Sequence, residues 1–447
     1  MTITDKWLNT APTHWTRGRL KNLISSVTNG TWGSDPVENG YDVRCVRAAD
    51  FDRASRRVDL STAPLRHVEP SSFRQHLLKA GDLILEKSGG GEKQPVGMAV
   101  LFTGSTKAVC SNFCARVRPA VGVDHRFLTY VFAAAYGQGL TQAAVKQTTG
   151  IQNLDTGAFF ASRWTYPAKD EQRRIADFLD IEIGRIDRVR KSREAQGELL
   201  NLMLDQLVDG ATAGDSETLK RLGVDSNRAD WGLGRISRLC QVVPGYAFPS
   251  EEFLHNGGTR LLRGINVSVD ETSWKDTVSW DEEKMPTPPR FHLRDGDLIV
   301  GMDRPWISSG MRMTFISERD LPALLLQRVA CLRPKSTEVD MKYVYWSLRS
   351  SMFRQAVEGE LTGVSVPHLS GDQIGGFTFP LPPVSTQRDI SHRLSNHSAS
   401  IRKLRSTMQR QVKLLDERRQ TLITAAVTGQ FDISTASGRS VTEGVSA

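Results

Sequence analysis

Two long stretches of the chain carry apolar residues at a spacing of seven. The positions in step are Leu394, Ile401, Met408, Leu415 and Leu422 in the later stretch, and Leu179, Ile186, Leu200 and Leu207, with Arg193 between them, in the earlier one. Neither stretch contains proline between residues 170 and 208 or between 386 and 428. This period predicts two helices, each with a seam for a partner helix. A helix of about 40 residues is about 60 Å long.

The charges of the two stretches are opposite in sign. Residues 170–208 hold seven basic and nine acidic side chains, a net of −2, whereas residues 385–428 hold nine basic and three acidic ones, a net of +6. Opposite charge favours pairing of the two helices with each other over self-pairing. An antiparallel pair centred near Arg193 and Met408 would place Ile186 with Leu415 and Leu200 with Ile401. The alternative is that each helix packs only on its own domain.

The regions before each predicted helix, about 14–166 and 230–381, are rich in glycine and in short apolar runs. Four of these runs predict strands, at 83–85, 98–102, 298–300 and 311–316. Two segments, 124–136 and 340–353, predict short helices that each begin at an aspartate. The pattern therefore predicts an α+β fold for each region, with a mixed sheet and few helices.

The two halves of the chain repeat each other at a shift of 215 residues. The shift places Pro167, Gln172 and Ile175 on Pro382, Gln387 and Ile390, and the segment 81–84 (Gly-Asp-Leu-Ile) on 296–299. It also places Arg118-Pro119 on Arg333-Pro334, and a one-residue slip pairs Trp15 with Trp231. Because solenoid repeats run to about 20–50 residues, this period is a duplicated domain with its connector. Antiparallel helices would then give an internal pseudo-twofold repeat. The paired tryptophans are expected to be core anchors.

Composition restricts the class of protein. Hydrophobic residues make up 39% and charged residues 24% of 447, which is ordinary for a soluble protein. We expect no membrane span, no secretory signal and a cytoplasmic location. The five scattered cysteines, Cys110-x3-Cys114 among them, are expected to be buried thiols rather than a metal site. A net charge of +8 permits a polyanionic partner such as nucleic acid but does not establish one.

The connector motifs resemble those of one family. The order is a mixed domain, Pro-x-x-x-Glu-Gln-Arg-Arg-Ile-Ala from Pro167, a long helix, and a second copy that ends in Leu-Leu-Asp-Glu-Arg-Arg-Gln-Thr-Leu-Ile-Thr-Ala-Ala-Val-Thr-Gly-Gln at 414–430. From about residue 14 to 433 the chain resembles the DNA-specificity subunit of a Type I restriction-modification enzyme. The second copy departs from the motif at 385–387 (Ser-Thr-Gln), where glutamate is lost.

The resemblance implies a set of domains, partners and cofactors. Two target recognition domains, 1–168 and 214–383, would each read one half of a bipartite double-stranded DNA target, and a tail would follow at 431–447. The long helices, 169–213 and 384–430, would set the spacer and dock two modification (methyltransferase) subunits. Restriction (motor) subunits would complete the complex. No cofactor is expected on this chain, since S-adenosylmethionine, ATP and Mg²⁺ would belong to the partner subunits.

Motifs that would make this chain an enzyme are missing from the sequence. It has no P-loop, no Gly-x-Ser-x-Gly elbow and no amino-methyltransferase loop. The nearest resemblance to the carboxylate set of a metal-dependent phosphodiesterase is Asp276 with Glu282 and Lys284. We interpret the polar segment 280–286 around it as a solvated loop. The readings left open are a DNA-reading subunit, a coiled-coil scaffold that ignores DNA, and, least favoured, a self-sufficient nuclease or methyltransferase.

Glycine-rich and polar loops are the candidate DNA contacts, because glycine lets the backbone approach a phosphate and polar side chains read base edges. Corresponding loops recur in both halves. The candidates in the first half are Asn29, Thr31, Lys87, Lys93, Gln94, Lys146, Gln147 and Gln152. The candidates in the second half are Tyr246, Arg304, Trp306, Ser308, Thr362, Ser365 and His368. For each single residue, the competing interpretation is a solvated loop side chain.

Overall fold

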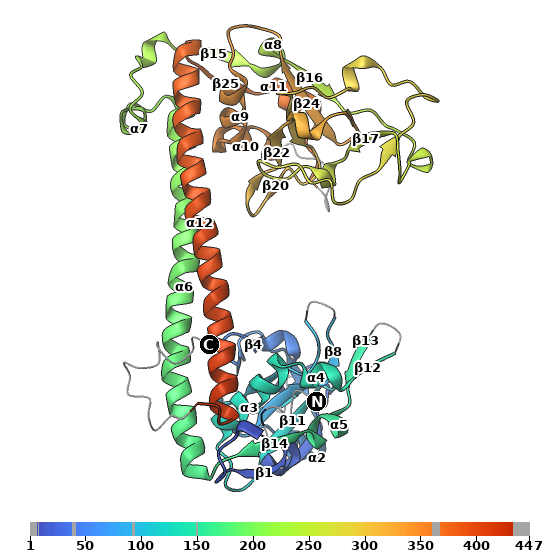
Figure 1. Cartoon of the computed structure of the whole chain (residues 1–447), viewed down its shortest axis with the longest axis vertical. Coiled ribbons are helices and arrows are strands. Elements are labelled where there is room, and N and C mark those ends of the chain that lie inside the picture. Colours follow the sequence, from blue (N-terminus) through green and yellow to red (C-terminus); the bar gives the residue numbers. More distant parts are fainter. Residues whose placement is uncertain are drawn as a thin grey trace. The chain divides into compact units, whose positions relative to one another are not determined.

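The computed structural model describes residues 7, 9–37, 42–91, 94–148, 151–359 and 367–431. The chain divides into two compact units: the first unit is Met1–Glu194 with Gln409–Ala447, and the second unit is Ala195–Met408. Each unit holds one α+β domain, called here a recognition domain, and part of both long helices (Figure 1). These helices are α6 (Lys169–Ala213) and α12 (Val384–Val427).

A six-stranded sheet forms the centre of the first recognition domain. Its strands, in spatial order, are β2 (Ile24–Asn29), β11 (Cys114–Pro119), β7 (Leu83–Glu86), β9 (Ala99–Leu101), β5 (Arg57–Val58) and β4 (Phe51–Asp52). Smaller sheets are β10 (Ala108–Cys110) with β3 (Asp42–Val46) and β6 (Leu65–His67), β12 (Val145–Thr148) with β13 (Ile151–Leu154) and β8 (Ser88–Gly89), and β1 (Thr16–Arg19) with β14 (Arg163–Tyr166). All four residues of β7 are buried, as expected for a central strand covered on both faces.

Short helices cover this sheet. They are α2 (Pro70–His76), α3 (His125–Gly137), α4 (Leu140–Ala143) and α5 (Thr156–Ala161), with 3₁₀ turns at Leu20–Leu23 and Ala48–Asp50. Helix α3 begins where predicted, since the Asp124 carboxylate accepts hydrogen bonds from the backbone N–H groups of Arg126 and Phe127. Its buried face, from Phe127 to Ala135, shares a core cluster with the first turns of α6 and the last turns of α12.

The second recognition domain is built around a four-stranded sheet. Its strands, in spatial order, are β16 (Cys240–Pro244), β24 (Val329–Pro334), β19 (Leu298–Gly301) and β22 (Met313–Phe315). Smaller sheets are β18 (Ser279–Trp280) with β17 (Thr259–Leu262) and β23 (Ala323–Leu325), β15 (Gly232–Arg235) with β25 (Thr378–Leu381), and β20 (Trp306–Ile307) with β21 (Gly310–Met311). The helices are α7 (Ser216–Leu222), α8 (Ile236–Leu239), α9 (Met341–Arg349), α10 (Ser351–Glu358) and α11 (Gly371–Gly376), with 3₁₀ turns at Arg228–Asp230, Ser250–Glu252, Gly264–Asn266, Pro289–Phe291 and Glu318–Asp320.

The two recognition domains share one strand order. The series β2-β11-β7-β9 corresponds to β16-β24-β19-β22, and β10-β3-β6 corresponds to β23-β17-β18, with the same parallel and antiparallel pairings. The pair β1-β14 corresponds to β15-β25. The sequence repeat is therefore a repeat of fold, and the predicted α+β class with two recognition domains and two long helices is confirmed.

A buried ion pair explains two of the repeated segments. In the first unit, Nε and Nη2 of Arg118 each donate at 2.8 Å to the two carboxylate oxygens of Asp82. In the second unit, Arg333 donates in the same fork to Asp297 at 2.8 and 2.7 Å. Both aspartates are almost fully buried. Because this pair fastens a central strand to its neighbour, the Gly-Asp-Leu-Ile and Arg-Pro segments recur together.

A buried glutamine explains why the connector motif recurs. Oε1 of Gln172 accepts a hydrogen bond from the backbone N–H of Asp124 at 3.0 Å, and its Nε2 donates to the carbonyl of Pro167 at 2.9 Å. Gln387 makes the matching contacts with Asp340 and Pro382, at 2.8 Å each. The glutamine thus joins the start of each long helix to the short helix of its own recognition domain.

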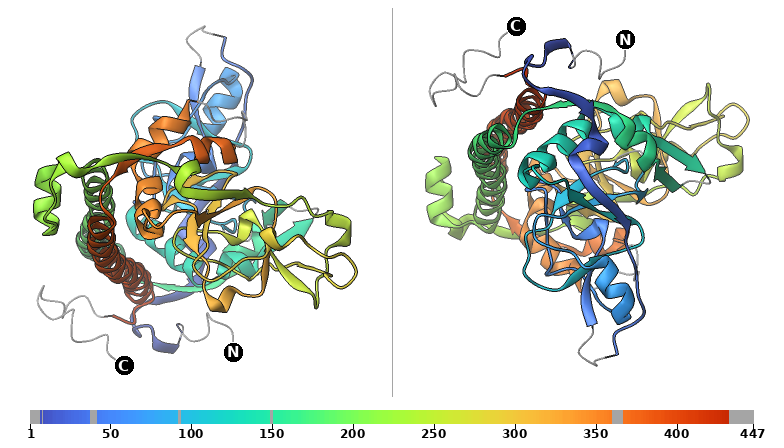
Figure 2. Two further views of the ribbon diagram at one scale, coloured as in Figure 1. Left: turned by 90° about the horizontal axis from the view of Figure 1, so that it is seen from above. Right: turned by 90° about the horizontal axis from the view of Figure 1, so that it is seen from below.

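The long helices pack antiparallel within each unit (Figures 1 and 2). In the first unit, the start of α6 and the end of α12 share one cluster, which contains Leu179, Ile186, Leu415 and Leu422. In the second unit, the end of α6 and the start of α12 share another, which contains Leu200, Leu207, Leu394 and Ile401. Met408 is half-buried. Each cluster also includes recognition-domain side chains, so the seams pack on the domains as well as on each other.

One local expectation was wrong, and another was wrong at a single residue. The helix predicted over 340–353 is interrupted at Ser350, which has extended dihedral angles and donates its hydroxyl to the carbonyl of Ser347, so α9 and α10 are separate. The segment 280–286 was interpreted as a solvated loop, which is correct for residues 281–286 and wrong for the first residue. Trp280 is buried in β18, and its indole N–H donates to the carbonyl of Met285. A tryptophan that can place its N–H on a carbonyl is readily buried despite polar neighbours.

Other expectations were correct. All five cysteines are buried and free, and burial raises the pKa of the Cys240 thiol to about 11. Trp15 and Trp231 are both buried, as core anchors should be. None of the described helices combines the length and the apolar character that a bilayer-crossing helix requires.

Candidate nucleic-acid interface

The first candidate loop, which follows β2, lies directly on the backbone of the turn between β10 and β11. The N–H of Thr31 donates to the carbonyl of Cys110 at 2.8 Å. A Cβ on Gly30 would lie 2.1 Å from the carbonyl oxygen of Ser111, so only glycine fits there. Asn29 is exposed beside this contact and Thr31 is half-buried. The close approach fixes the loop while leaving the Asn29 side chain available to a ligand.

The second candidate loop, after β7, is glycine-rich and has a tight turn. Gly89 and Gly90 have φ of 112° and 60°, and the backbones of Gly91 and Gln94 bond each other at 3.0 and 3.2 Å. Gln94 is exposed and Lys87 is half-buried. Lys93 lies outside the described residues. The loop therefore presents backbone and amide groups in the way that phosphate or base contact requires.

The hairpin of β12 and β13 carries the third set of candidates. Lys146 pairs with Asp155 at 2.7 Å, although its side chain is largely exposed. Gln152 accepts a hydrogen bond from the N–H of Val96 at 3.3 Å, so its amide supports the glycine-rich loop. Only the backbone of Gln147 is described, opposite Gln152 in the ladder. Lys146 is thus a neutralised cation, and Gln152 is partly engaged before any ligand binds.

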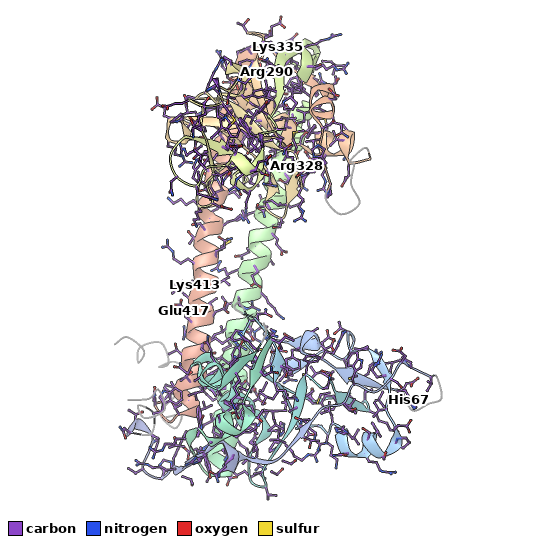
Figure 3. All side chains as sticks on the ribbon, turned by 90° about the vertical axis from the view of Figure 1, so that its right-hand side faces the viewer. His67, Arg290, Arg328, Lys335, Lys413 and Glu417 are labelled. Atoms are coloured by element: carbon purple, nitrogen blue, oxygen red, sulfur yellow. The ribbon has the colours of Figure 1, made fainter. Side chains whose placement is uncertain are left out.

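In the second unit, one cluster joins two of the candidates. His368 Nδ1 lies 2.7 Å from Oδ1 of Asp303, and Arg328 Nη1 donates to Oδ2 of the same carboxylate at 2.8 Å (Figure 3 labels Arg328). Arg304 follows Asp303 with a φ of 44° and donates its N–H to the carbonyl of Pro367 at 2.8 Å. Burial raises the pKa of Asp303, but the hydrogen bonds from His368 and Arg328 outweigh it and lower the pKa below its usual range.

The remaining candidates of the second unit lie elsewhere in it. Trp306 and Ser308 line a cavity of about 260 Å³ together with Asp205 and Asp209 of α6. Arg349 and Arg354 line the same cavity, so its charged groups are mixed in sign. Tyr246 is exposed, and its ring packs on Phe248 and Phe291. Thr362 and Ser365 lie outside the described residues.

A cleft in the first unit gathers residues that the sequence did not single out. It encloses about 490 Å³ and is lined by Trp32, Arg47, Glu86, Ser88, Asn112 and Phe113. Phe113 is 49% exposed and Trp32 is 37% exposed, unusual values for such large rings. The signal available in the sequence was Phe113 next to a polar pair at the end of a turn, but an aromatic residue before a buried strand is easily read as core.

The sequence alternative of a carboxylate set at Asp276, Glu282 and Lys284 does not assemble. Asp276 pairs with Arg263 at 3.2 Å, Glu282 lies 2.6 Å from His292, and Lys284 pairs with Asp281 at 3.3 Å. Each of the three groups has a different partner. Among the residues that the structure describes, no three His, Cys, Asp or Glu side chains gather as a metal site would require.

Comparison with known proteins points to one family. Residues 228–414 match the model of the Type I restriction modification DNA specificity domain. The chain is 33% identical over 191 residues to the Type I restriction enzyme EcoAI specificity subunit of Escherichia coli, a match covering 42% of this chain and 32% of that one. It is 22% identical over 285 residues to the MjaVIII specificity subunit of Methanocaldococcus jannaschii, covering 64% and 66%. The matches thus span between one third and two thirds of these relatives' own length.

Solved structures show the same fold over almost the whole chain. One chain from a structure of the assembly and conformational transition of the type I R-M system has a TM-score of 0.70 at 15% identity, covering 94% of this chain and 99% of that one. The HsdS subunit from Thermoanaerobacter tengcongensis has a TM-score of 0.50 at 16% identity, covering 94% and 98%. These solved chains share the fold of this chain, and residues 228–414 are similar to the Type I restriction modification DNA specificity domain.

Proposed function

We propose that this chain is the DNA-reading subunit of a Type I restriction-modification complex and has no catalytic role of its own. The proposal rests on one observation: the same domain fold occurs twice, and the residues of the second copy match the DNA specificity domain. The frames of the two recognition domains share their ion pair and their glutamine, while their loops differ. Such a design reads two unlike half-sites of a bipartite, asymmetric sequence in double-stranded DNA.

The two long helices would set the distance between the half-sites. Helices α6 and α12 each run without interruption through parts of both units. A continuous helix has a fixed rise of about 1.5 Å per residue, so its length fixes a spacing better than a loop would. The spacer between the half-sites would accordingly be non-specific in sequence and fixed in length.

The outward faces of these helices would seat two modification subunits. Apolar side chains that remain strongly exposed there are Ile181, Leu199, Leu202, Leu404 and Leu414. Exposed apolar residues gathered along a helix typically mark a protein interface. S-adenosylmethionine would belong to those subunits, and ATP and Mg²⁺ to restriction subunits that join the assembly.

Methylation mapping tests the proposal directly. The chain would be co-expressed with its modification subunit in a host without other methylation, and the modified positions sequenced. We expect one bipartite target with a fixed spacer. A four-residue insertion in both α6 and α12 adds about 6 Å, and should lengthen the permitted spacer by about two base pairs.

The same insertion in the exposed turn after Asn256 is the control and should leave the spacer unchanged. Methylation at unrelated sequences, or a spacer that ignores the helix insertion, would contradict the proposal. The scaffold alternative is tested by Lys87→Ala with Arg304→Ala, which should weaken DNA binding without loss of the modification subunits. If DNA binding persists unchanged while the assembly forms, the scaffold reading gains support.

A further inference from the structure

The cleft of the first unit has the volume and the groups of a site for a small planar ligand. The exposed rings of Trp32 and Phe113 line it. Its volume of about 490 Å³ falls within the range of small-ligand sites. The Arg66 guanidinium lies over one face of the Trp32 ring at 4.6 Å, so Phe113 is the more open of the two rings. Exposed aromatic rings are the surfaces on which unstacked bases lie.

A carboxylate stands among the residues that line this cleft. Glu86 is 4% exposed, and its Oε2 accepts a hydrogen bond from Arg53 Nη2 at 3.4 Å. Its Oε1 makes no hydrogen bond with any residue that the structure describes. Burial raises the pKa of Glu86, and the Arg53 guanidinium only partly offsets this effect. A buried carboxylate with a free oxygen is a strong acceptor for an N–H group of a ligand.

An arginine at the same cleft is held in one orientation. Arg47 donates from Nε and Nη2 to the two carboxylate oxygens of Asp50 at 3.0 and 2.8 Å, and also to the carbonyl of Thr62. Its Nη1 makes no hydrogen bond with the residues that the structure describes. A guanidinium group held in this way can donate its remaining N–H groups to an anion such as phosphate.

We infer that this cleft binds one unstacked nucleobase carrying an exocyclic amino group, adenine or cytosine, from the half-site of the first recognition domain. The inference rests on the DNA-reading function proposed above. The base stacks on Phe113 and Trp32, its amino group donates to Glu86, and Arg47 meets the adjoining phosphate. A base held in the duplex cannot reach Glu86, because that carboxylate is 4% exposed, so the base must leave the stack.

Methylation mapping of variants in the full modification complex tests the assignment of the reading residues. Glu86→Gln replaces a carboxylate, which only accepts hydrogen bonds, with an amide that also donates them. The preference for the correct base over other bases, at one position of one half-site, should therefore fall about 5- to 150-fold. Phe113→Ala should weaken binding about 5- to 150-fold through lost stacking, and Phe113→Leu should be intermediate. The other half-site serves as an internal control for folding and assembly and should not change.

Glu69→Gln, an exposed carboxylate of the same unit, is the matched control and should behave as the unchanged protein. If Glu86→Gln and Phe113→Ala alter neither base preference nor affinity, the site is overturned while the DNA-reading function stands. If the unchanged complex methylates no defined sequence, the proposed function itself fails, and this inference with it.

A second measurement tests whether the base leaves the duplex. An abasic site is placed opposite the base whose preference Glu86→Gln alters, so that unpairing no longer opposes binding. Affinity for that duplex should rise at least about fivefold for the unchanged protein, and the gain should disappear in Phe113→Ala. Equal or weaker binding of the abasic duplex would mean that the base is read in place, which overturns the inference.

Discussion

The two recognition domains place different chemical groups at corresponding positions of one shared frame. In the first, Glu86 ends strand β7 beside an open cleft. At the shift of 215 residues the second has Gly301, where an added Cβ would lie 3.3 Å from the Cβ of Arg312. The Arg312 guanidinium occupies this region, donating to the carbonyls of Val267 and Asp303 at 3.0 and 2.9 Å.

The residues around these two positions also differ, with an aromatic ring in the first domain and a cation in the second. Phe113, an exposed ring in the first domain, corresponds to Arg328, which is bound to Asp303. The first domain thus offers an acceptor in an aromatic cleft, and the second offers cations in a closed hydrogen-bonded cluster. Acceptors suit the amino groups of adenine and cytosine, whereas arginine suits the O6 and N7 atoms of guanine. The difference teaches that a duplicated frame can present unlike chemical groups through a few side chains at the ends of the same strands.

The largest loss of stability should come from breaking the buried ion pair that both domains share. Asp297→Ala leaves Arg333 buried without its partner, because only 10% of that side chain is exposed. Loss of one member of a buried ion pair costs about 3–5 kcal/mol of unfolding free energy. Asp82→Ala should cost less, since 32% of the Arg118 side chain is exposed and can be rehydrated. Urea denaturation of both variants measures the difference, and equal losses would contradict the role given to burial.

Much of this frame could be predicted from the sequence, because its determinants are local or repeated. The seven-residue period marked both helices, and Asp124 and Asp340 marked the starts of α3 and α9. The break at Ser350 was missed, since a serine within an apolar pattern carries no strong stop signal. The repeat pointed to Gln172 and Gln387 without revealing their buried hydrogen bonds, which join segments distant in sequence.

The candidate interface was less predictable than the frame. The glycine-rich loops could be found, because glycine marks close backbone approach. That Lys146 is paired with Asp155, or that Trp306 and Ser308 lie beside carboxylates of α6, depends on tertiary neighbours that no local pattern encodes. Glu86 and Phe113 were missed for the same reason. Phe113 lies in the turn between β10 and β11, and the side of the sheet edge that this turn faces is set by the tertiary fold.

A smaller loss of stability should follow when a methyl group is added at two corresponding glycines. A Cβ on Gly30 or on Gly245 would lie 2.1 or 2.0 Å from a backbone carbonyl oxygen, of Ser111 or Leu326. Each Gly→Ala variant should lose about 1–3 kcal/mol of unfolding free energy because the backbone must shift. Gly91→Ala, which has no neighbour within 4 Å, is the matched control and should be near neutral. A thermal or urea unfolding series that ranks all three variants alike would refute this account.

Replacement of His368 should lower the stability of the second domain alone, and the loss should depend on pH. The folded-state pKa of Asp303 is lowered, so its contribution to stability is present above the ordinary carboxylate pKa and lost as pH falls through the folded pKa. His368→Ala should raise that pKa toward its ordinary value and cost about 0.5–1.5 kcal/mol near neutral pH. NMR titration of Asp303 reads the shift, with Lys335→Ala as a control distant in sequence. An unchanged Asp303 titration would show that His368 does not hold the carboxylate.

The smallest loss of stability concerns an ion pair between the second recognition domain and helix α12. In the second unit Arg402 of α12 donates to Asp270 at 2.8 Å. At the corresponding position of α6 in the first unit, Asp187 lies 3.4 Å from Arg419 of α12, so that contact joins the two helices to each other. Because the Arg402 side chain is 55% exposed, Arg402→Ala should cost only about 0.2–1 kcal/mol of unfolding free energy.

A double-mutant cycle decides whether the sign of this pair matters. Arg402→Asp alone places two carboxylates together and should be more destabilising than Arg402→Ala, whereas Arg402→Asp with Asp270→Arg should recover part of the loss. Tyr345, whose hydroxyl also donates to Asp270, limits that recovery. No recovery at all would mean that Asp270 is fixed by its backbone, with a φ of 62°, rather than by its charge. Recovery would show that the opposite charges of Arg402 and Asp270 help to attach the second domain to α12.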